Sequence, residues 1–514
     1  MTATPARAGL ARPASRGSRR HGANTRWAGS GLALLVAATY FMENLDGTII
    51  ATAAPRMARS FHTSADSIGV VMTAYLVALA VGIPASGWLA ERWGPRRVFA
   101  LAITVFTVAS LLCALSDSLP LLTGMRVLQG LGGAMMVPVG RLIVLRTTDR
   151  KDLATAIAYL TWPALLAPVV APVLGGLFVT CASWRWIFLV NLPLGVACLI
   201  AELRMVATTQ PAEEKAPLDW PGFLLTGTGL ATLVLGMEEV GGGGGLARPL
   251  VALAVSAVLL AVSVRHLRRA ARPLLDLRSL QVRTYRASTL DGSIYRTMVS
   301  AAPFLLPLMF QDAYRWSPLR TGLMVIAVFV GNVGIKPATT PLIRRFGFRL
   351  VILVSTVGLA VSFAGCAALS SGTPLWMTAL ILLASGIFRS TGFSAYNTLQ
   401  FADVGPDILP AANTLAATAQ QLAAGLGVAV TALVLRGAQA LPGATGHSTE
   451  PYRVTWLVMV VITCLSGWQT FKLPPDAGSA ARPSARVVST SAAPRVASAD
   501  VGRTKPDSHS ESRP

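Results

Sequence analysis

Two stretches of the sequence decide the fold, "GWLAERWGPRRV" (residues 87–98) and "TPLIRRFGFRLV" (residues 340–351). Aligned without gaps, they share Leu, Arg, Gly, Arg and Val at the same positions. Each stretch is basic and lies between two long apolar runs. Internal repeats of this kind are common in polytopic membrane proteins. The pair therefore predicts two related halves, each with this loop between its second and third apolar segments.

The composition is that of a chain that crosses a membrane many times. Of 514 residues, 53% are hydrophobic and 13% are charged, and the mean hydropathy is +0.57. Soluble domains carry about 25% charged residues. Apolar runs of about 18 residues are long enough to span a bilayer as helices. Fourteen such runs are predicted, at residues 28–54, 67–90, 98–116, 120–143, 154–180, 185–204, 219–238, 249–267, 287–310, 319–338, 350–370, 375–398, 409–435 and 453–471.

The predicted fold class is an all-α polytopic membrane protein with 14 transmembrane helices. The repeat groups them into two six-helix bundles with pseudo-twofold symmetry, separated by a two-helix insert. The tails are poor in hydrophobic residues and are expected to be disordered. The expected boundaries are a basic tail at 1–26, the N-terminal bundle at 27–205, the insert and linkers at 206–286, the C-terminal bundle at 287–472 and a second tail at 473–514.

Basic residues predict the orientation of the chain. With both ends in the cytoplasm, the inner tails and loops hold 32 Lys or Arg residues, and the outer loops hold 8. Because cytoplasmic loops carry such an excess, we expect an N-in/C-in topology. The remaining four fall inside spans: Arg126, Arg296, Lys336 and Arg389.

The sequence disfavours several other classes of protein. The five cysteines include no Cys-x-x-Cys pair, so no metal site and no disulfide framework is expected. The net charge of +21 lies mostly in tails and short loops, so no nucleic-acid partner is expected. "GGGGG" (residues 241–245) precedes no Lys-Ser/Thr and is interpreted as a flexible loop, and no cofactor is expected. The first apolar run is too long for a cleaved signal peptide.

Seven motifs occur in order along the chain: "LDGTIIATAAP" (45–55), "GWLAERWGPRRV" (87–98), "LLTGMRVLQGLGGA" (121–134), "SWRWIFLVNLPLG" (183–195), "DWPG" (219–222), "QDAYRWSPLRTG" (311–322) and "NTLAATAQQLAAGLGVA" (413–429). Together they resemble the major facilitator superfamily, specifically its fourteen-span drug:proton antiporter branch. The resemblance covers all fourteen spans. The fifth-span motif of that branch, Gly-x-x-x-Gly-Pro-x-x-Gly-Gly, is weakened here, because "APVVAPVLGG" (167–176) has Ala167 and Ala171 for two glycines.

The resemblance implies a secondary transporter in a plasma membrane, here the bacterial inner membrane, and no enzyme activity. Such a protein would export amphipathic small molecules, such as drugs, antibiotics or related metabolites, in exchange for protons. It would work by alternating access, with the proton gradient as the driving force. The weakened motif leaves a proton-coupled or passive transporter of one specific metabolite as an alternative. A third hypothesis is a non-transporting sensor or scaffold, and the oligomeric state stays open.

Two acids, Glu43 and Asp46, lie well inside the first span, where a charge costs about 2.5–3.5 kcal/mol. Arg126 lies at a similar depth in the fourth span, which the family fold places beside the first. Arg126 would stabilise the carboxylate of Asp46, whereas a dry pocket would favour its protonated form. We therefore expect Asp46 to carry the proton, with Arg126 as its partner and Glu43 as a companion. A static bridge that only fixes helix packing is the alternative.

The other candidate site residues form three groups. A gating role in the cytoplasmic loop, implied by the resemblance, falls on Glu91, Arg92, Gly94, Arg96 and Arg97. Helix packing is expected of Gly130, Gly132, Gly133, Pro172, Gly175 and Gly176. A substrate cavity that favours an anionic or polar group beside apolar bulk is expected at Arg296, Arg389, Gln420 and Gln421.

Overall fold

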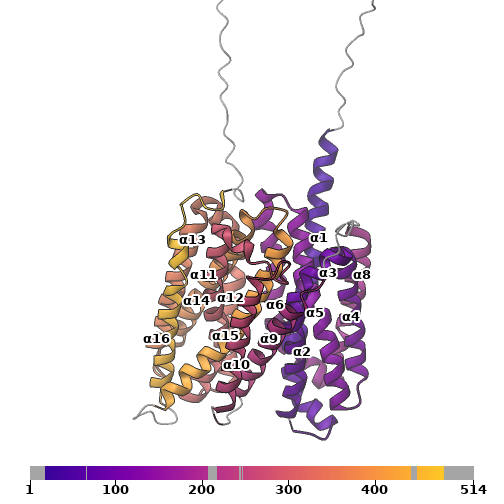
Figure 1. Ribbon diagram of the computed structural model, residues 1–514. Coiled ribbons are helices and arrows are strands. Elements are labelled where there is room, and N and C mark those ends of the chain that lie inside the picture. The colour runs from indigo at the N-terminus through magenta and orange to yellow at the C-terminus, as the bar shows by residue number, and fades with distance from the viewer. Residues whose placement is uncertain are drawn as a thin grey trace, which may run out of the picture. The chain divides into compact units, whose positions relative to one another are not determined.

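The computed structural model describes residues 18–64, 66–206, 217–241, 245, 247–440 and 448–479. These residues form helices and turns, and no strand occurs among them. The described residues belong to one compact unit, residues 1–482 (Figure 1). The "GGGGG" loop lies almost wholly outside the described residues, as do residues 1–17 and 480–514 of the two expected tails.

The N-terminal half consists of α1 (Ser18–Ser60), η1 (Asp66–Ile68), α2 (Gly69–Gly82), η2 (Ile83–Ala85), α3 (Ser86–Trp93), α4 (Pro95–Leu115), α5 (Leu119–Thr147), η3 (Arg150–Asp152), α6 (Leu153–Cys181), α7 (Trp186–Leu189) and α8 (Asn191–Met205). Two helices follow it, α9 (Trp220–Gly241) and α10 (Ala247–Leu267). The C-terminal half consists of η4 (Leu277–Gln281), α11 (Arg283–Leu308), the π-helical turn η5 (Met309–Ala313), α12 (Pro318–Gly334), α13 (Lys336–Ala368), α14 (Leu375–Ala402), α15 (Leu409–Gln439), α16 (Glu450–Leu465) and α17 (Trp468–Phe471).

Each of the fourteen predicted spans falls on a helix or on consecutive helices. Within the described chain, eleven helical segments are long and apolar enough to cross a membrane. The three spans outside that set correspond to α1, α6 and α12. The tenth span is divided, because α12 ends at Gly334 and the chain resumes as α13 from Lys336. The all-helical, many-span architecture is confirmed, while fourteen crossings and the N-in/C-in topology stay predictions.

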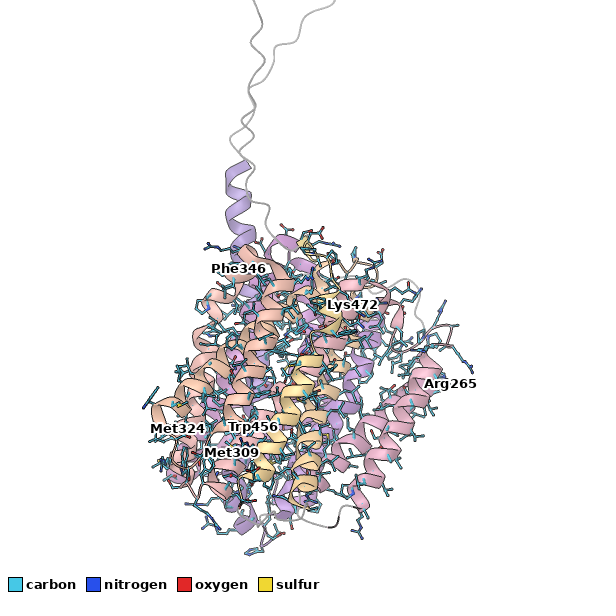
Figure 2. All side chains as sticks on the ribbon, turned by 90° about the vertical axis from the view of Figure 1, so that its left-hand side faces the viewer. Arg265, Met309, Met324, Phe346, Trp456 and Lys472 are labelled. Carbon is cyan, nitrogen blue, oxygen red and sulfur yellow. The ribbon has the colours of Figure 1, made fainter. Side chains whose placement is uncertain are left out.

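The two loop motifs adopt the same backbone geometry. Gly94 has φ 86° and ψ 140° between α3 and α4, and Gly347 has φ 80° and ψ 164° inside α13, which it divides. This region is accessible almost only to glycine, so the shared Gly of the two motifs is required by the bend. We call the end of the unit with Gly94 and Gly347 the motif end, and the opposite end the far end. Figure 2 shows Phe346 near the motif end and Met324 towards the far end.

Helix packing repeats between the halves. In the N-terminal half, α1 packs on α6, α4 on α5, α2 on α5, and α4 on α8. The corresponding contacts in the C-terminal half join α11 to α15, α13 to α14, α12 to α14, and α13 to α16. The same pairings in the same chain order are what a duplicated six-helix bundle requires, and the expected bundle boundaries at residues 205 and 287 stay predictions.

The insert is attached through one of its two helices. α9 packs against α2, α15 and α10, whereas only 17% of the apolar window of α10 is buried inside the protein. The start of α9 is fixed by Asp219, which accepts hydrogen bonds from Gly222 N (3.0 Å) and Leu274 N (3.1 Å). His266 Nε2 lies 2.8 Å from the same carboxylate. Burial opposes the charge on Asp219, but these hydrogen bonds outweigh it and lower the pKa of the carboxyl.

Both expected tails are shorter than predicted. α1 begins at Ser18, so residues 18–26 are helical backbone rather than tail. At the other end, Leu473 and Ala477 are buried. A Cβ on Gly478 would lie 2.8 Å from Leu399 Cδ1 and 2.9 Å from Phe348 Cδ2. The assignment of 473–479 to a disordered tail is therefore wrong, because this turn packs its apolar residues on α13 and α14.

Candidate functional site

Asp46 lies in the middle of a buried polar network and is 1% exposed. Its Oδ2 forms an ion pair with Arg126 of α5. Its Oδ1 accepts hydrogen bonds from Gln129 Nε2 and from Asn191 Nδ2, both at 2.8 Å. Three helices, α1, α5 and α8, thus meet at one carboxylate. The structure brings the expected pair of Asp46 and Arg126 together.

The partners of Asp46 define its chemical state in this conformation. Arg126, Gln129 and Asn191 all donate to its oxygens. A protonated carboxyl would have to donate one hydrogen bond, and none of these three groups accepts it in this arrangement. The network therefore suits a carboxylate, and protonation of Asp46 requires one of the donors to move away or the Asn191 amide, whose Oδ1 has no partner, to turn over.

Arg126 is held on every side by groups from neighbouring helices. Its guanidinium carbon lies 4.0 Å from the centroid of the Tyr75 ring, within cation–π distance. Its Nη1 also donates to Gln129 Oε1 at 2.7 Å, and its Nε donates to Val71 O at 3.4 Å. Gln129 Nε2 in turn donates to Ser110 Oγ of α4 at 2.8 Å. The site is therefore rigid around the cation, while the carboxylate comes from a different helix, α1.

Sequence reasoning did not single out Gln129 or Asn191. The signal for Gln129 was present, because it follows Arg126 by three residues and so lies on the same face of the helix. Asn191 begins α8 inside a quoted motif, but its contact with α1 depends on how α8 packs, which the sequence does not reveal. Both complete the hydrogen bonding of Asp46.

Glu43 lies one helical turn from Asp46 but outside its network. Its Oε2 is buried and has no hydrogen-bond partner, and the same holds for Tyr75 Oη. A Cβ on Gly133 would lie 3.7 Å from the Glu43 carboxyl carbon and 3.3 Å from that phenol oxygen. The two unpaired groups therefore face the same small volume beside Gly133. Glu43 is a neighbour of the site, without a direct bond to Arg126 in the structure.

The loop residues at the motif end form two local clusters. Arg96 Nε lies 3.6 Å from Glu202 Oε1, and Arg96 Nη2 donates to Leu203 O at 2.8 Å, which ties α4 to the end of α8. Arg92 lies over the ring of Trp88, with 5.3 Å to its centroid. Glu91 interacts electrostatically with Arg146 of α5. Arg97 belongs to the same first turn of α4. The contacts of Arg96 and Glu91 join neighbouring helices of the N-terminal half, whereas that of Arg92 lies within α3, and the gating role stays a prediction.

The candidate packing residues differ in how tightly they are enclosed. A Cβ on Gly130 would lie 2.6 Å from Tyr75 O, and one on Gly132 would lie 2.8 Å from Phe106 N. A Cβ on Gly175 would lie 1.9 Å from Thr52 Oγ1, so α6 approaches α1 closely there. Gly176 has open space beside it, and Pro172 is exposed on α6. The close approaches support a packing role for Gly130, Gly132 and Gly175. Gly176 makes no such approach.

The four candidate cavity residues do not form one group. Arg296 is 4% exposed and donates from Nη2 to Asn397 Oδ1 at 2.7 Å. Gln420 Nε2 donates to the same oxygen at 3.3 Å. Arg389 shares no hydrogen bond with them, and its Nη1 is buried without a hydrogen-bond partner. Gln421 is half-buried on the next position of α15. Arg296 and Gln420 thus share a site through Asn397, which sequence reasoning did not identify.

Hydrogen bonds between the two halves gather towards the motif end. Arg141 of α5 donates from Nε to Asn413 Oδ1 (2.6 Å) and from Nη1 to Gln420 Oε1 (3.2 Å). Asn413 Nδ2 donates to Pro138 O at 2.8 Å. Arg150 donates to Ala402 O at the end of α14 (3.4 Å) and to Val404 O (3.1 Å). Lys336 Nζ donates to Ser394 Oγ (2.7 Å) and to Thr161 Oγ1 of α6 (3.5 Å). These contacts close the motif end between the halves.

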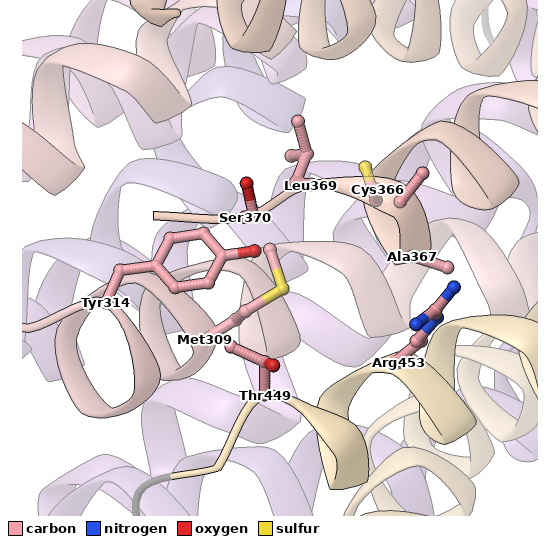
Figure 3. Close-up of a pocket in the computed structure, with 9 residues that line it drawn as sticks. Met309, Tyr314, Cys366, Ala367, Leu369, Ser370, Thr449 and Arg453 are labelled. Atoms are coloured by element: carbon pink, nitrogen blue, oxygen red, sulfur yellow. The ribbon is translucent and has the colours of Figure 1, made fainter. Parts of the chain in front are cut away.

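Two concavities at the far end lie apart from these buried charges. One of about 200 Å³ is lined by Met309, Tyr314, Cys366, Ala367, Ala368, Leu369, Ser370, Thr449 and Arg453. Figure 3 shows Tyr314 and Met309 on one side of it and Arg453 on the other. Trp456 Nε1 lies 3.2 Å from the sulfur of Met309. Figure 2 labels these two residues close together. The second is wider and is lined by Arg56, Arg59, Ser60 and residues 182–185. Neither contains a candidate residue.

Comparisons with known proteins agree on one family. The Major Facilitator Superfamily model matches residues 36–428 and 292–499. The putative multidrug resistance protein MdtD of Escherichia coli strain K12 is 35% identical over 458 residues, which is 88% of this chain and 96% of that protein. MdtD of Shigella boydii serotype 18 matches equally.

Solved structures show the same fold at low sequence identity. The proton:xylose symporter XylE matches with a TM-score of 0.62 and 13% identity, over 88% of this chain and 98% of that one. The human organic anion transporter MFSD10 matches with a TM-score of 0.59 and 16% identity, over 87% and 98%. With a family model covering most of the chain and relatives at 35% identity, the chain belongs to the major facilitator superfamily.

Proposed function

We propose that this protein exports amphipathic small molecules in exchange for protons, by alternating access. The observation that carries the proposal is the carboxylate of Asp46, which α1 contributes to a site otherwise built by α5 and α8. A carboxylate held by donors from other helices can change its protonation state when those helices move. The name of the MdtD relatives, multidrug resistance protein, supports export of drug-like molecules.

Coarser statements rest directly on the family. Membership of the major facilitator superfamily indicates a transporter rather than an enzyme. The apolar helices and the relatives indicate a multi-pass protein of a bacterial inner membrane. What the proposal adds is the direction, the amphipathic substrate, the proton gradient as driving force, and Asp46 as proton carrier with Arg126 as its partner.

The contacts between the halves support alternating access. The bonds of Arg141, Arg150 and Lys336 close the motif end, which is one of the two states that such a cycle needs. With the expected N-in orientation, the closed end faces the cytoplasm. In that state Asp46 is paired with Arg126, and in the proposed cycle the proton arrives from the far end and displaces a donor such as Arg126. Release would then follow once the pair re-forms.

Everted membrane vesicles from a pump-deficient host test the proposal. We expect that adding a transported amphipath dissipates a preformed pH gradient in vesicles with the wild-type protein and not in vesicles with Asp46→Asn. The matched control is Glu450→Gln, which removes a carboxylate whose side chain is 67% exposed. Coupled flux in Asp46→Asn equal to wild type would refute the carrier assignment. Flux of substrate without any proton movement would favour the passive alternative, and no flux of any compound would favour a scaffold.

A further inference from the structure

Buried positive charge exceeds buried negative charge in this protein. In the part of the chain that the structure describes, four basic side chains are less than 9% exposed, namely Arg126, Arg141, Arg296 and Lys336. Only Arg126 has an acidic partner, Asp46. Among the residues that the structure describes, none of the other three forms an ion pair. Removing an ion from water without a counter-charge is costly, so these cations need an explanation.

The acids that are less than 9% exposed are already engaged elsewhere. Glu202 lies 3.6 Å from Arg96 at the motif end. Asp291 accepts hydrogen bonds from Thr470 N at 2.7 Å and from Thr470 Oγ1 at 2.8 Å, and so caps α17. Asp46 is committed to Arg126. Glu43 has a buried Oε2 without a hydrogen-bond partner, but it lies beside Gly133 and, within the described chain, forms no ion pair with Arg141 or Arg296.

Neutral amides hold two of the uncompensated cations together between the halves. Arg296 of α11 donates to Asn397 Oδ1, and Arg141 of α5 donates to Gln420 Oε1. Gln420 joins them, because its Nε2 donates to the same oxygen of Asn397. The two guanidinium groups carry the same charge and are linked through these two amides. An arrangement that gathers like charges and supplies no acid is suited to a negatively charged ligand.

Arg296 keeps hydrogen-bonding capacity free for such a ligand. Its Nε and Nη1 are buried and have no partner. Gly292 and the Tyr396 ring lie beside Nη1, since a Cβ on Gly292 would lie 3.5 Å from Nη1 and 3.3 Å from that ring. The Phe393 ring centroid is 5.5 Å from the Arg296 guanidinium carbon, and the Phe401 centroid is 5.4 Å from that of Arg141. Charge and aromatic surface therefore lie side by side.

We propose that Arg296, assisted by Arg141, binds the carboxylate of an amphipathic substrate between the two halves. The planar fork of a guanidinium matches the two oxygens of a carboxylate, and the aromatic rings would contact the apolar part. The inference rests on the proposed transport function and adds the charge of the substrate. It also differs from the sequence-based cavity, because Arg389 is replaced by Arg141 and Asn397.

A binding experiment on the purified full-length protein tests this site. In an uncharged detergent, fluorescence titration measures the affinity for dansylglycine, an aromatic carboxylate, and for its uncharged amide. We expect the wild type to bind the acid at least about 10-fold more tightly than the amide, and Arg296→Gln to lose about 10–100-fold for the acid alone. Arg320→Gln removes an exposed arginine near the far end and is expected to keep wild-type affinity. Equal affinity for acid and amide, or no loss in Arg296→Gln, would overturn the proposal.

A second variant covers the case in which Arg296→Gln does not fold. Asn397→Asp places a carboxylate 2.7 Å from Arg296 Nη2 and so supplies the missing counter-charge internally. We expect this variant to unfold at a higher temperature than the wild type and to lose dansylglycine binding. In the wild type, the acid should raise the melting temperature, and sodium chloride at the same ionic strength should not. Wild-type binding by Asn397→Asp, or equal stabilisation by chloride, contradicts the inference.

The failure of this inference can be told apart from that of the proposed function. Equilibrium binding needs no proton gradient, so binding of the acid without any coupled flux would remove the antiport proposal and leave the anion site. Coupled flux of neutral or cationic amphipaths without binding of the acid would leave antiport and remove the site.

Discussion

The buried pair of Asp46 and Arg126 allows a quantitative prediction of stability. Arg126→Met leaves the carboxylate of Asp46 buried with only amide donors, and stranding one member of a buried pair costs about 3–5 kcal/mol. Asp46→Asn is milder, because Gln129 Oε1 and the Tyr75 ring still hold the guanidinium. We expect it to cost about 1–3 kcal/mol. The double variant should be more stable than the sum of the two losses predicts, by about 2–3 kcal/mol.

Reversible unfolding by SDS in mixed micelles, followed by tryptophan fluorescence, measures these free energies. The matched control is the exposed pair of Glu450 and Arg453, whose closest charged atoms lie 3.6 Å apart. An exposed pair contributes roughly 0–1 kcal/mol, so its cycle should show coupling below about 0.5 kcal/mol. Additive losses for Asp46→Asn and Arg126→Met would show that the two side chains are not coupled in the membrane protein, and the geometry of the site would then be wrong.

Three further predictions concern other parts of the unit. Gly386→Ala should lower the melting temperature strongly, since its Cβ would lie 2.0 Å from Val328 O, whereas Gly176→Ala should change it little; equal effects would contradict the packing. Arg141→Gln removes three hydrogen bonds between the halves, so distances across the motif end measured with spin labels should lengthen and broaden, and an unchanged distribution would show that these bonds do not hold it closed. Asp219→Asn should destabilise the protein at pH 7 by about 0.5–2 kcal/mol. Because the folded pKa of Asp219 is lowered, the difference from wild type should persist above about pH 4 and shrink as the pH falls through the folded pKa; a difference that does not depend on pH would assign the loss to shape alone.

The helical architecture was predictable because it depends on local sequence patterns. Apolar runs of spanning length locate the helices, and the glycine shared by the two loop motifs marks the bends at Gly94 and Gly347. The division of the tenth span at Ile335 and the start of α1 at Ser18 were not predictable in this way. Both depend on where flanking residues pack, and periodicity does not report that.

The sequence predicted the candidate site only where two opposite charges stabilise each other inside the membrane. Asp46 and Arg126 were expected together because each is costly alone in a membrane. Gln129 and Asn191 are uncharged amides, which give no such signal. Arg141 was assigned to no role, because its partners Asn413 and Gln420 come from the other half of the chain. Contacts between the halves depend on how two bundles dock, and one sequence does not contain that information.

The bends at Gly94 and Gly347 have a mechanical consequence. Gly94 joins the short helix α3 directly to α4, and Gly347 lies inside α13, which continues through its bend. Helices connected so directly cannot slide past each other along their axes, and a displacement at one end has to appear at the other as a tilt of the pair. In each half the bend is therefore a pivot at a single glycine, and the two halves share this glycine although the equivalent position before it is Glu91 in one half and Arg344 in the other.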